Sequence, residues 1–134
     1  MDDLKPGRTG RAEMIVGTRD TAPRVGSGQI AVLATPVMIN LIEEAALDAV
    51  EAALPEGKQS LGTHLDVSHI AATPVGMKVT ASAELVSVEG RKLTFRVEAR
   101  DAADLIGEGT HQRVVVTAAT FSERVESKSR SSGG

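Results

Sequence analysis

The feature that most constrains the fold is a pair of neighbouring segments, 77–88 and 92–103, in which apolar and polar residues alternate. A period of two is typical of strands that bury one face of a sheet. The apolar set is Met77, Val79, Ala81, Ala83 and Leu85 in the first segment and Leu93, Phe95, Val97 and Ala99 in the second. Glu89 and Gly90, between them, favour a tight hairpin turn. These segments predict an antiparallel hairpin with one covered face.

A long helix is predicted upstream and can cover that face. Thr35 suits the N-cap, and Pro36 suits the first helical position, where its missing N–H group is not needed. From 37 to 54 most residues are good helix formers, and Pro55 and Gly57 end the segment. One helical face gathers Met38, Ile42, Ala45, Ala49 and Ala53. This amphipathic pattern predicts a helix that packs on the sheet.

Further strands are expected at 13–17, 61–70 and 106–121, and 29–33 is either a short strand or an extended approach to the helix. The strands from 61 onward are predicted to form an antiparallel meander, and Gly107 and Gly109 suggest a bulge or a close backbone approach. The fold class is therefore α+β, a long helix on a curved antiparallel sheet. We expect a flexible lead-in at 1–12, one domain at 13–121 and a disordered tail at 122–134.

Composition narrows the function classes. The chain has 134 residues, 41% hydrophobic and 25% charged, which fits one domain with an ordinary core. Aromatic residues make up 1%, cysteine is absent and the formal net charge is -3, so we expect no disulfide, no thiolate catalysis and no nucleic-acid partner. No segment resembles a secretory leader or a membrane span, so we expect a cytoplasmic protein without a membrane partner.

Three histidines, His64, His69 and His111, are the first candidates for chemistry. A single histidine on a strand is most often a surface or hydrogen-bonded structural residue. A metal site needs three or four converging ligands, but His64 and Asp66 share one face of their strand while His69 lies on the other. We therefore expect no metal site.

Two helix residues allow both a structural and a functional interpretation. Glu43 lies on the border of the polar stripe, where a partly desolvated carboxylate suits a general base, but a flank glutamate reaching water fits the wheel better. Thr35 can cap the helix, and its hydroxyl would also lie beside the positive end of the helix dipole, where oxyanions are favoured.

Residues 60–116 and 32–46 resemble the fluoroacetyl-CoA thioesterase family of hotdog-fold proteins. The resemblance rests on the motifs LATP, LIEE, SLGT, DVSHIAATP and GTHQR. It implies a catalytic Thr–Glu–His set at Thr35, Glu43 and His69, with Gly62 and Arg113 as substrate-binding residues.

The resemblance also implies hydrolysis of an acyl-CoA to a free acid and CoA, with no cofactor because CoA is part of the substrate. His69 or Glu43 would be the general base, and Thr35 would either attack the carbonyl or position the attacking water. Backbone N–H groups at Gly62 or at the helix N-terminus would stabilise the oxyanion. The family pattern further implies a homodimer with a joint sheet and a site formed across its interface.

One departure from the family bears on the acyl group. The fluoroacetyl-specific enzyme carries a Phe-rich lid just before its catalytic Thr, whereas residues 24–33 here contain no aromatic residue. We therefore expect a small acyl group that is not necessarily fluoroacetyl. For the CoA phosphates, Lys58, Arg91, Lys92 and Arg113 are candidate cations.

Two other functions remain open. The first is a non-catalytic acyl-CoA or small-acid binding protein on the same fold, which would have no need of Thr35, Glu43 and His69 together. The second is another hotdog reaction such as hydration of an enoyl-CoA, but that branch places its catalytic Asp and His differently.

Overall fold

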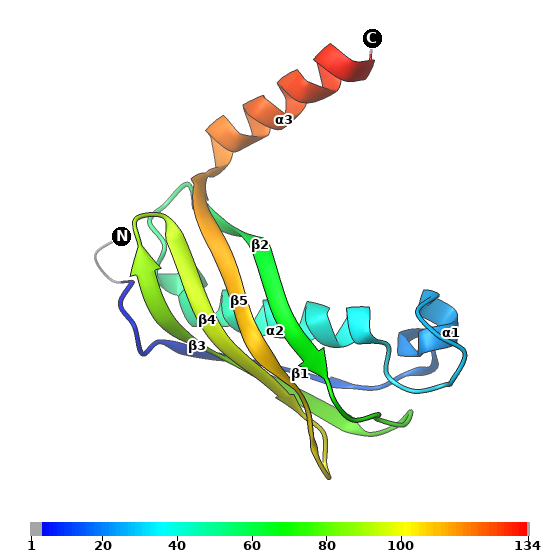
Figure 1. The fold of residues 1–134 in the computed structure, drawn as a ribbon. Helices are drawn as coiled ribbons and strands as arrows, with labels where there is room; N and C mark the ends of the chain where they lie inside the picture. Colours follow the sequence, from blue (N-terminus) through cyan, green and yellow to red (C-terminus); the bar gives the residue numbers. More distant parts are fainter. Residues whose placement is uncertain (1–3, 134) are drawn as a thin grey trace.

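The structure, a computed structural model, describes residues 4–133. Its sheet consists of β1 (Thr9–Ile15), β2 (Lys58–His69), β3 (Lys78–Glu89), β4 (Lys92–Arg100) and β5 (Leu105–Thr117). The helices are α1 (Ala22–Val25), α2 (Thr35–Val50) and α3 (Ala118–Gly133), with short 3-10 turns η1 (Thr18–Asp20) and η2 (Glu51–Ala53). Figure 1 shows the sheet curving around α2, which confirms the α+β class.

The strand order is β1-β3-β4-β5-β2, with every neighbouring pair antiparallel. The meander predicted from 61 onward is correct for β3, β4 and β5 but wrong for β2, which pairs with β5. The edge of β3 that β2 would have used is taken by β1. Strand β1 begins at Thr9, so 9–12 belong to the sheet and not to the lead-in. Residues 29–33 form no strand, because Val32 and Leu33 make only isolated bridges.

The core lies between α2 and the concave face of the sheet. The predicted inward residues within β3 and β4 are buried, as are Met38, Ile42, Ala45 and Ala49 of α2, which confirms the two periodicities there. Met77, just before β3, and Ala53, in η2, were also predicted to face inward and are only partly buried. The helix starts one residue earlier than predicted, with Ala34 at the N-cap, and gives way to η2 after Val50. Nearly all of the packed side chains are aliphatic, which allows the helix and strands to approach closely.

Two glycines mark this close packing. A Cβ on Gly10 of β1 would collide with the Ala45 carbonyl oxygen and the Ala49 backbone of α2, and one on Gly107 would lie 2.6 Å from Sδ of Met38. A Cβ on Gly109 would collide with the Asp66 carbonyl oxygen of β2. The close approach predicted at Gly107 and Gly109 is thereby confirmed.

The segment after β5 differs from the expectation. Residues 122–133 are helical as part of α3, where we predicted a disordered tail, and α3 projects away from the sheet (Figure 1). The stretch 118–131 contains no proline or glycine, and Arg130 pairs with Glu126 at 3.1 Å one helical turn earlier, both of which favour helix. Strand β1 begins before the predicted domain start at 13, and α3 continues past the predicted domain end at 121. The division of the chain into one domain with two flanking segments stays a prediction.

Within residues 4–133, no helix combines the length and the apolar character that crossing a membrane requires. The cytoplasmic location stays a prediction.

The contact between Gly10 and α2 can be tested by mutation. Gly10→Ala should lower the free energy of unfolding by about 1–3 kcal/mol, because the added methyl group forces β1 away from α2. Urea denaturation measures the change, and Thr9→Ala on the exposed side of the same strand should stay within about 0.5 kcal/mol of wild type. Equal midpoints for the two variants would contradict this packing.

Candidate active site

Thr35 and His69 meet at the N-terminus of α2. Thr35 Oγ1 lies 2.7 Å from Nδ1 of His69, the last residue of β2. Backbone contacts bring the two segments together, since Leu33 N–H donates to the Thr73 carbonyl at 2.9 Å and Val32 forms a bridge with Pro74. The Thr35 hydroxyl therefore faces an imidazole rather than capping the helix.

Within residues 4–133, the second ring nitrogen of His69, Nε2, has no hydrogen-bond partner. Nε2 is buried without a protein donor or acceptor, and burial lowers the pKa of His69, an effect that the backbone of Ala71 opposes. The ring is therefore biased toward its neutral form, in which one nitrogen is free to accept a proton. A neutral imidazole in contact with a hydroxyl is an arrangement suited to general-base chemistry.

A cleft of about 410 Å³ opens beside this pair. Its walls come from the segment before α2 and the segment after β2, and they include Ser27, Gln29, Ile30, Val32, Ile70 and Ala72 together with Thr35 and His69. None of its lining residues is Phe, Tyr or Trp. The cleft borders the reactive pair with small and aliphatic side chains.

Glu43 belongs to a second group of residues, halfway along α2. Its Oε2 lies 3.3 Å from Nη1 of Arg113 on β5, and the side chains are 34% and 5% exposed respectively. A Cβ on Gly62 of β2 would lie 2.6 Å from the same Oε2, so the absence of a side chain there makes room for the carboxylate. The predicted position of Glu43 on the border of the polar stripe is confirmed.

The guanidinium of Arg113 is fully engaged by the protein. Nε donates to Ser60 Oγ at 2.9 Å and Nη2 to the Ser60 carbonyl at 3.0 Å, while Nη1 faces Glu43 and Nε2 of His111. Burial lowers the pKa of Arg113, and the charge and hydrogen bond of Glu43 oppose that shift. Arg113 is therefore placed to hold Glu43. Of the four cations considered for the CoA phosphates, Arg113 is buried, whereas Lys58, Arg91 and Lys92 are exposed.

Sequence reasoning missed His111 as part of this group. Its ring is fully buried and stacks against Phe95, with centroids 6.0 Å apart. Burial is the main cause that lowers the pKa of His111, and the charge of Arg113 acts in the same direction. A signal was present, because His111 and Arg113 are two apart on one strand and so share a face.

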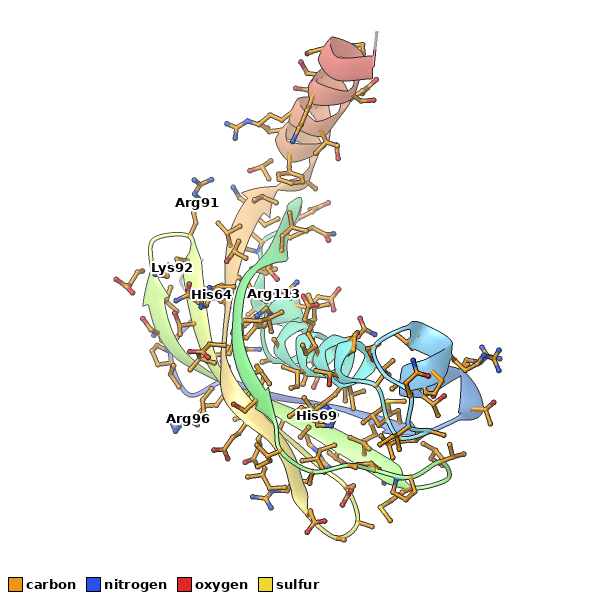
Figure 2. The ribbon with its side chains drawn as sticks, turned by 45° about the vertical axis from the view of Figure 1, so that its right-hand side comes forward. His64, His69, Arg91, Lys92, Arg96 and Arg113 are labelled. Carbon is orange, nitrogen blue, oxygen red and sulfur yellow. The ribbon has the colours of Figure 1, made fainter. Side chains whose placement is uncertain are left out.

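The structure thus brings the five predicted residues together in two groups, Thr35 with His69 and Glu43 with Gly62 and Arg113. In Figure 2, His69 and Arg113 lie at separate points along the sheet. Glu43 follows Thr35 by eight positions on α2, which places their backbones about 12 Å apart along the helix. Within residues 4–133 no hydrogen bond joins Glu43 to Thr35 or His69.

A long helix held in a curved antiparallel sheet is the architecture of hotdog-fold thioesterases. A solved fluoroacetyl-CoA thioesterase matches with a TM-score of 0.88 and 38% identity, over 95% of this chain and 98% of that one. A thioesterase superfamily member from Thermus thermophilus matches with a TM-score of 0.88 and 26% identity, over 98% and 99%.

Sequence comparison identifies the family to which this chain belongs within the hotdog-fold thioesterases. Residues 16–119 match the family described as fluoroacetyl-CoA-specific thioesterase. The fluoroacetyl-CoA thioesterase of Streptantibioticus cattleyicolor is 48% identical over 97 residues, 72% of this chain and 70% of that protein. The chain belongs to the fluoroacetyl-CoA-specific thioesterase family, and it is a hydrolase of acyl-CoA thioesters.

The buried His111 and the half-buried His69 predict how stability depends on pH. Their pKa values lie below the ordinary value of 6.5 in the folded chain, so the unfolded chain binds protons first as the pH falls. The free energy of unfolding should therefore be greatest above pH 6.5 and decrease as the pH falls from 6.5 toward the folded-state pKa values.

Urea denaturation at about pH 7.5 and about pH 5.5 measures this decrease. His111→Gln should show a smaller decrease than wild type, because one of the two groups no longer titrates. His64→Gln, at an exposed position, should match wild type. The same decrease in all three proteins would show that His111 is not a source of it.

Proposed function

We propose that Thr35, His69 and Glu43 carry out the hydrolysis, with Thr35 as the nucleophile. The 2.7 Å contact between Thr35 Oγ1 and His69 Nδ1 carries this proposal. His69 takes the hydroxyl proton as Oγ1 attacks the thioester carbonyl, and the C–S bond then breaks. The proton passes from His69 to the CoA thiolate, which leaves the acyl group on Thr35 as an ester.

The second half of the reaction needs an activated water. Glu43 removes a proton from water, which attacks the Thr35 ester and releases the free acid, while the proton returns to the Thr35 oxygen. Backbone N–H groups at the N-terminus of α2 or at Gly62 stabilise the oxyanion in both halves, and one such donor commonly contributes about 3 kcal/mol. The Glu43 side chain is 34% exposed, which supports this role because water reaches the carboxylate.

The distance between the two groups supports a homodimer. A carboxylate about 12 Å along α2 from Thr35 cannot act on an ester at Thr35 of the same chain. Strand β2 is an edge strand, and its Leu65 is 38% exposed, as expected of a strand that pairs with another copy. We propose that two copies join through β2 into one sheet, so that Glu43 of each copy completes the site of the other.

The acyl group is proposed to be small, and not necessarily fluoroacetyl. A solved fluoroacetyl-CoA thioesterase is described in complex with fluoroacetate and CoA, which supports a short acyl chain. The cleft beside Thr35 is lined by Gln29, Ile30 and Val32, in the segment where the family resemblance implies an aromatic lid. Aliphatic walls without an aromatic lid favour a broader preference among short chains.

Activity assays of matched variants test the catalytic set. His69→Ala and Thr35→Ala should each lower kcat by about a hundredfold or more, because the base or the nucleophile is lost. Release of CoA thiol is followed with acetyl-, fluoroacetyl-, propionyl- and isobutyryl-CoA. His64→Ala, an exposed histidine on the same strand, is the control and should match wild type. Binding of acyl-CoA with no turnover of any thioester by wild type would instead favour the non-catalytic binding protein.

Glu43→Gln should allow the first half of the reaction and slow the second. Mass spectrometry of the variant mixed with acyl-CoA should then show an added acyl mass that is absent from Glu43→Gln combined with Thr35→Ala. Glu44→Gln, on the solvent side of α2, should turn over normally. No acylation, together with lost activity, would mean that Thr35 positions water instead of attacking.

Mixing two inactive variants tests whether the site is shared between copies. When Glu43→Gln and His69→Ala chains are refolded together, half of the dimers contain both, and each of these has one intact site. About a quarter of wild-type activity should return if each site combines two chains. No recovery, with mixed dimers present by native mass spectrometry, would show that each chain carries a whole site.

A further inference from the structure

The buried ring of His111 lies against the group that holds Glu43. Nδ1 of the ring lies 2.8 Å from the His64 carbonyl oxygen, and Nε2 lies 3.1 Å from Nη1 of Arg113. A carbonyl only accepts hydrogen bonds and a guanidinium only donates them. The ring therefore carries its proton on Nδ1 and accepts from Arg113 through Nε2.

Burial and the neighbouring guanidinium favour this neutral state of the ring. A second proton on Nε2 would face the guanidinium of Arg113, and two donors would then point at each other. The groups that face the ring are Arg113 on the same strand, Glu43 on α2 and His64 on β2. Burial and Arg113 lower the pKa of His111, and the backbone of His64 and the charge of Glu43 oppose this shift.

The same Nη1 atom also lies 3.3 Å from the carboxylate of Glu43. Ser60 holds the guanidinium through Nε and Nη2. The planar group can then still tilt about the line that joins these two nitrogens, and this tilt would move Nη1. The bond to His111 removes that freedom. Since the carboxylate must also fit above Gly62, a shift of Nη1 would move the oxygen that is to activate water.

We propose that His111 is a positioning residue for Glu43, which it orients through Arg113 by accepting a hydrogen bond at Nε2. This inference rests on the role proposed above for Glu43. It assigns to His111 no contact with substrate, and it makes the tautomer of a buried histidine a requirement for fast turnover.

Two conservative variants separate the two edges of the ring. In His111→Gln the side-chain oxygen reaches the position of Nε2 and can accept from Arg113. In His111→Asn the amide reaches only the position of Nδ1, so the bond to the His64 carbonyl is kept and the acceptor is lost. His111→Gln should keep kcat within about threefold of wild type, and His111→Asn should lower it about tenfold or more with KM nearly unchanged. Equal kcat values for the two variants would overturn the proposal.

A double-mutant cycle separates positioning from a general loss of structure. In the Glu43→Gln background, His111→Asn should lower the remaining kcat no further, because there is no carboxylate left to orient. A merely structural role would lower kcat by the same factor in both backgrounds, and that result would contradict the inference. If Glu43→Gln alone leaves kcat unchanged, the catalytic role of Glu43 is what fails.

A measurement on the unmodified protein covers the case in which His111→Asn does not fold. Nitrogen chemical shifts of the His111 ring distinguish a proton on Nδ1 from one on Nε2. At about pH 8, above the ordinary histidine pKa, the ring should be neutral with its proton on Nδ1. A proton on Nε2 would leave no acceptor for Arg113 and would overturn the proposal.

Discussion

The antiparallel pairing of β2 with β5 is the constraint on which the site depends. In this register Gly62 lies opposite Arg113, and His69 lies opposite Gly107. Gly107 leaves space for Met38, so the N-terminal part of α2 lies close to the sheet. The segment before α2 is held by a hydrogen bond from Leu33 N–H to the Thr73 carbonyl. One pairing of strands therefore sets both groups of functional residues, and a shift of one residue would turn all their side chains to the opposite face.

Local patterns predicted the parts of the fold that depend on nearest neighbours in sequence. The alternation around Leu85 and Phe95, the turn at Gly90 and the buried stripe of α2 all follow from period and turn chemistry. The partner of β2 did not follow, because an alternating strand pairs equally well with β3 or β5 from its sequence alone. That choice depends on β1, which occupies the edge of β3, and β1 was short and weakly patterned in the sequence.

In the candidate site, too, the sequence did not reveal the features that depend on contacts between distant segments. Thr35, Glu43 and His69 were identified by resemblance. The sequence considered alone favoured structural roles for Glu43 and His69 and left both roles open for Thr35. His111 was passed over because its importance lies in the contact with Arg113 and the depth at which both are buried. Two polar side chains on an inward strand face are a costly arrangement unless each is paired, and here Ser60, Glu43 and the His64 carbonyl provide the partners.

In the proposed mechanism, the two groups of residues face different chemical demands. The pair of Thr35 and His69 needs a neutral imidazole beside a hydroxyl, which burial of the ring favours. Glu43 needs to stay accessible to water while its oxygen is held in place, and the buried Arg113 supplies a fixed donor without covering it. An α-helix cannot bring residues eight positions apart to one point, so a helix that carries both groups favours joining two copies around a two-fold axis. In the proposed dimer, the exposed edge of β2 is the surface that joins the two copies.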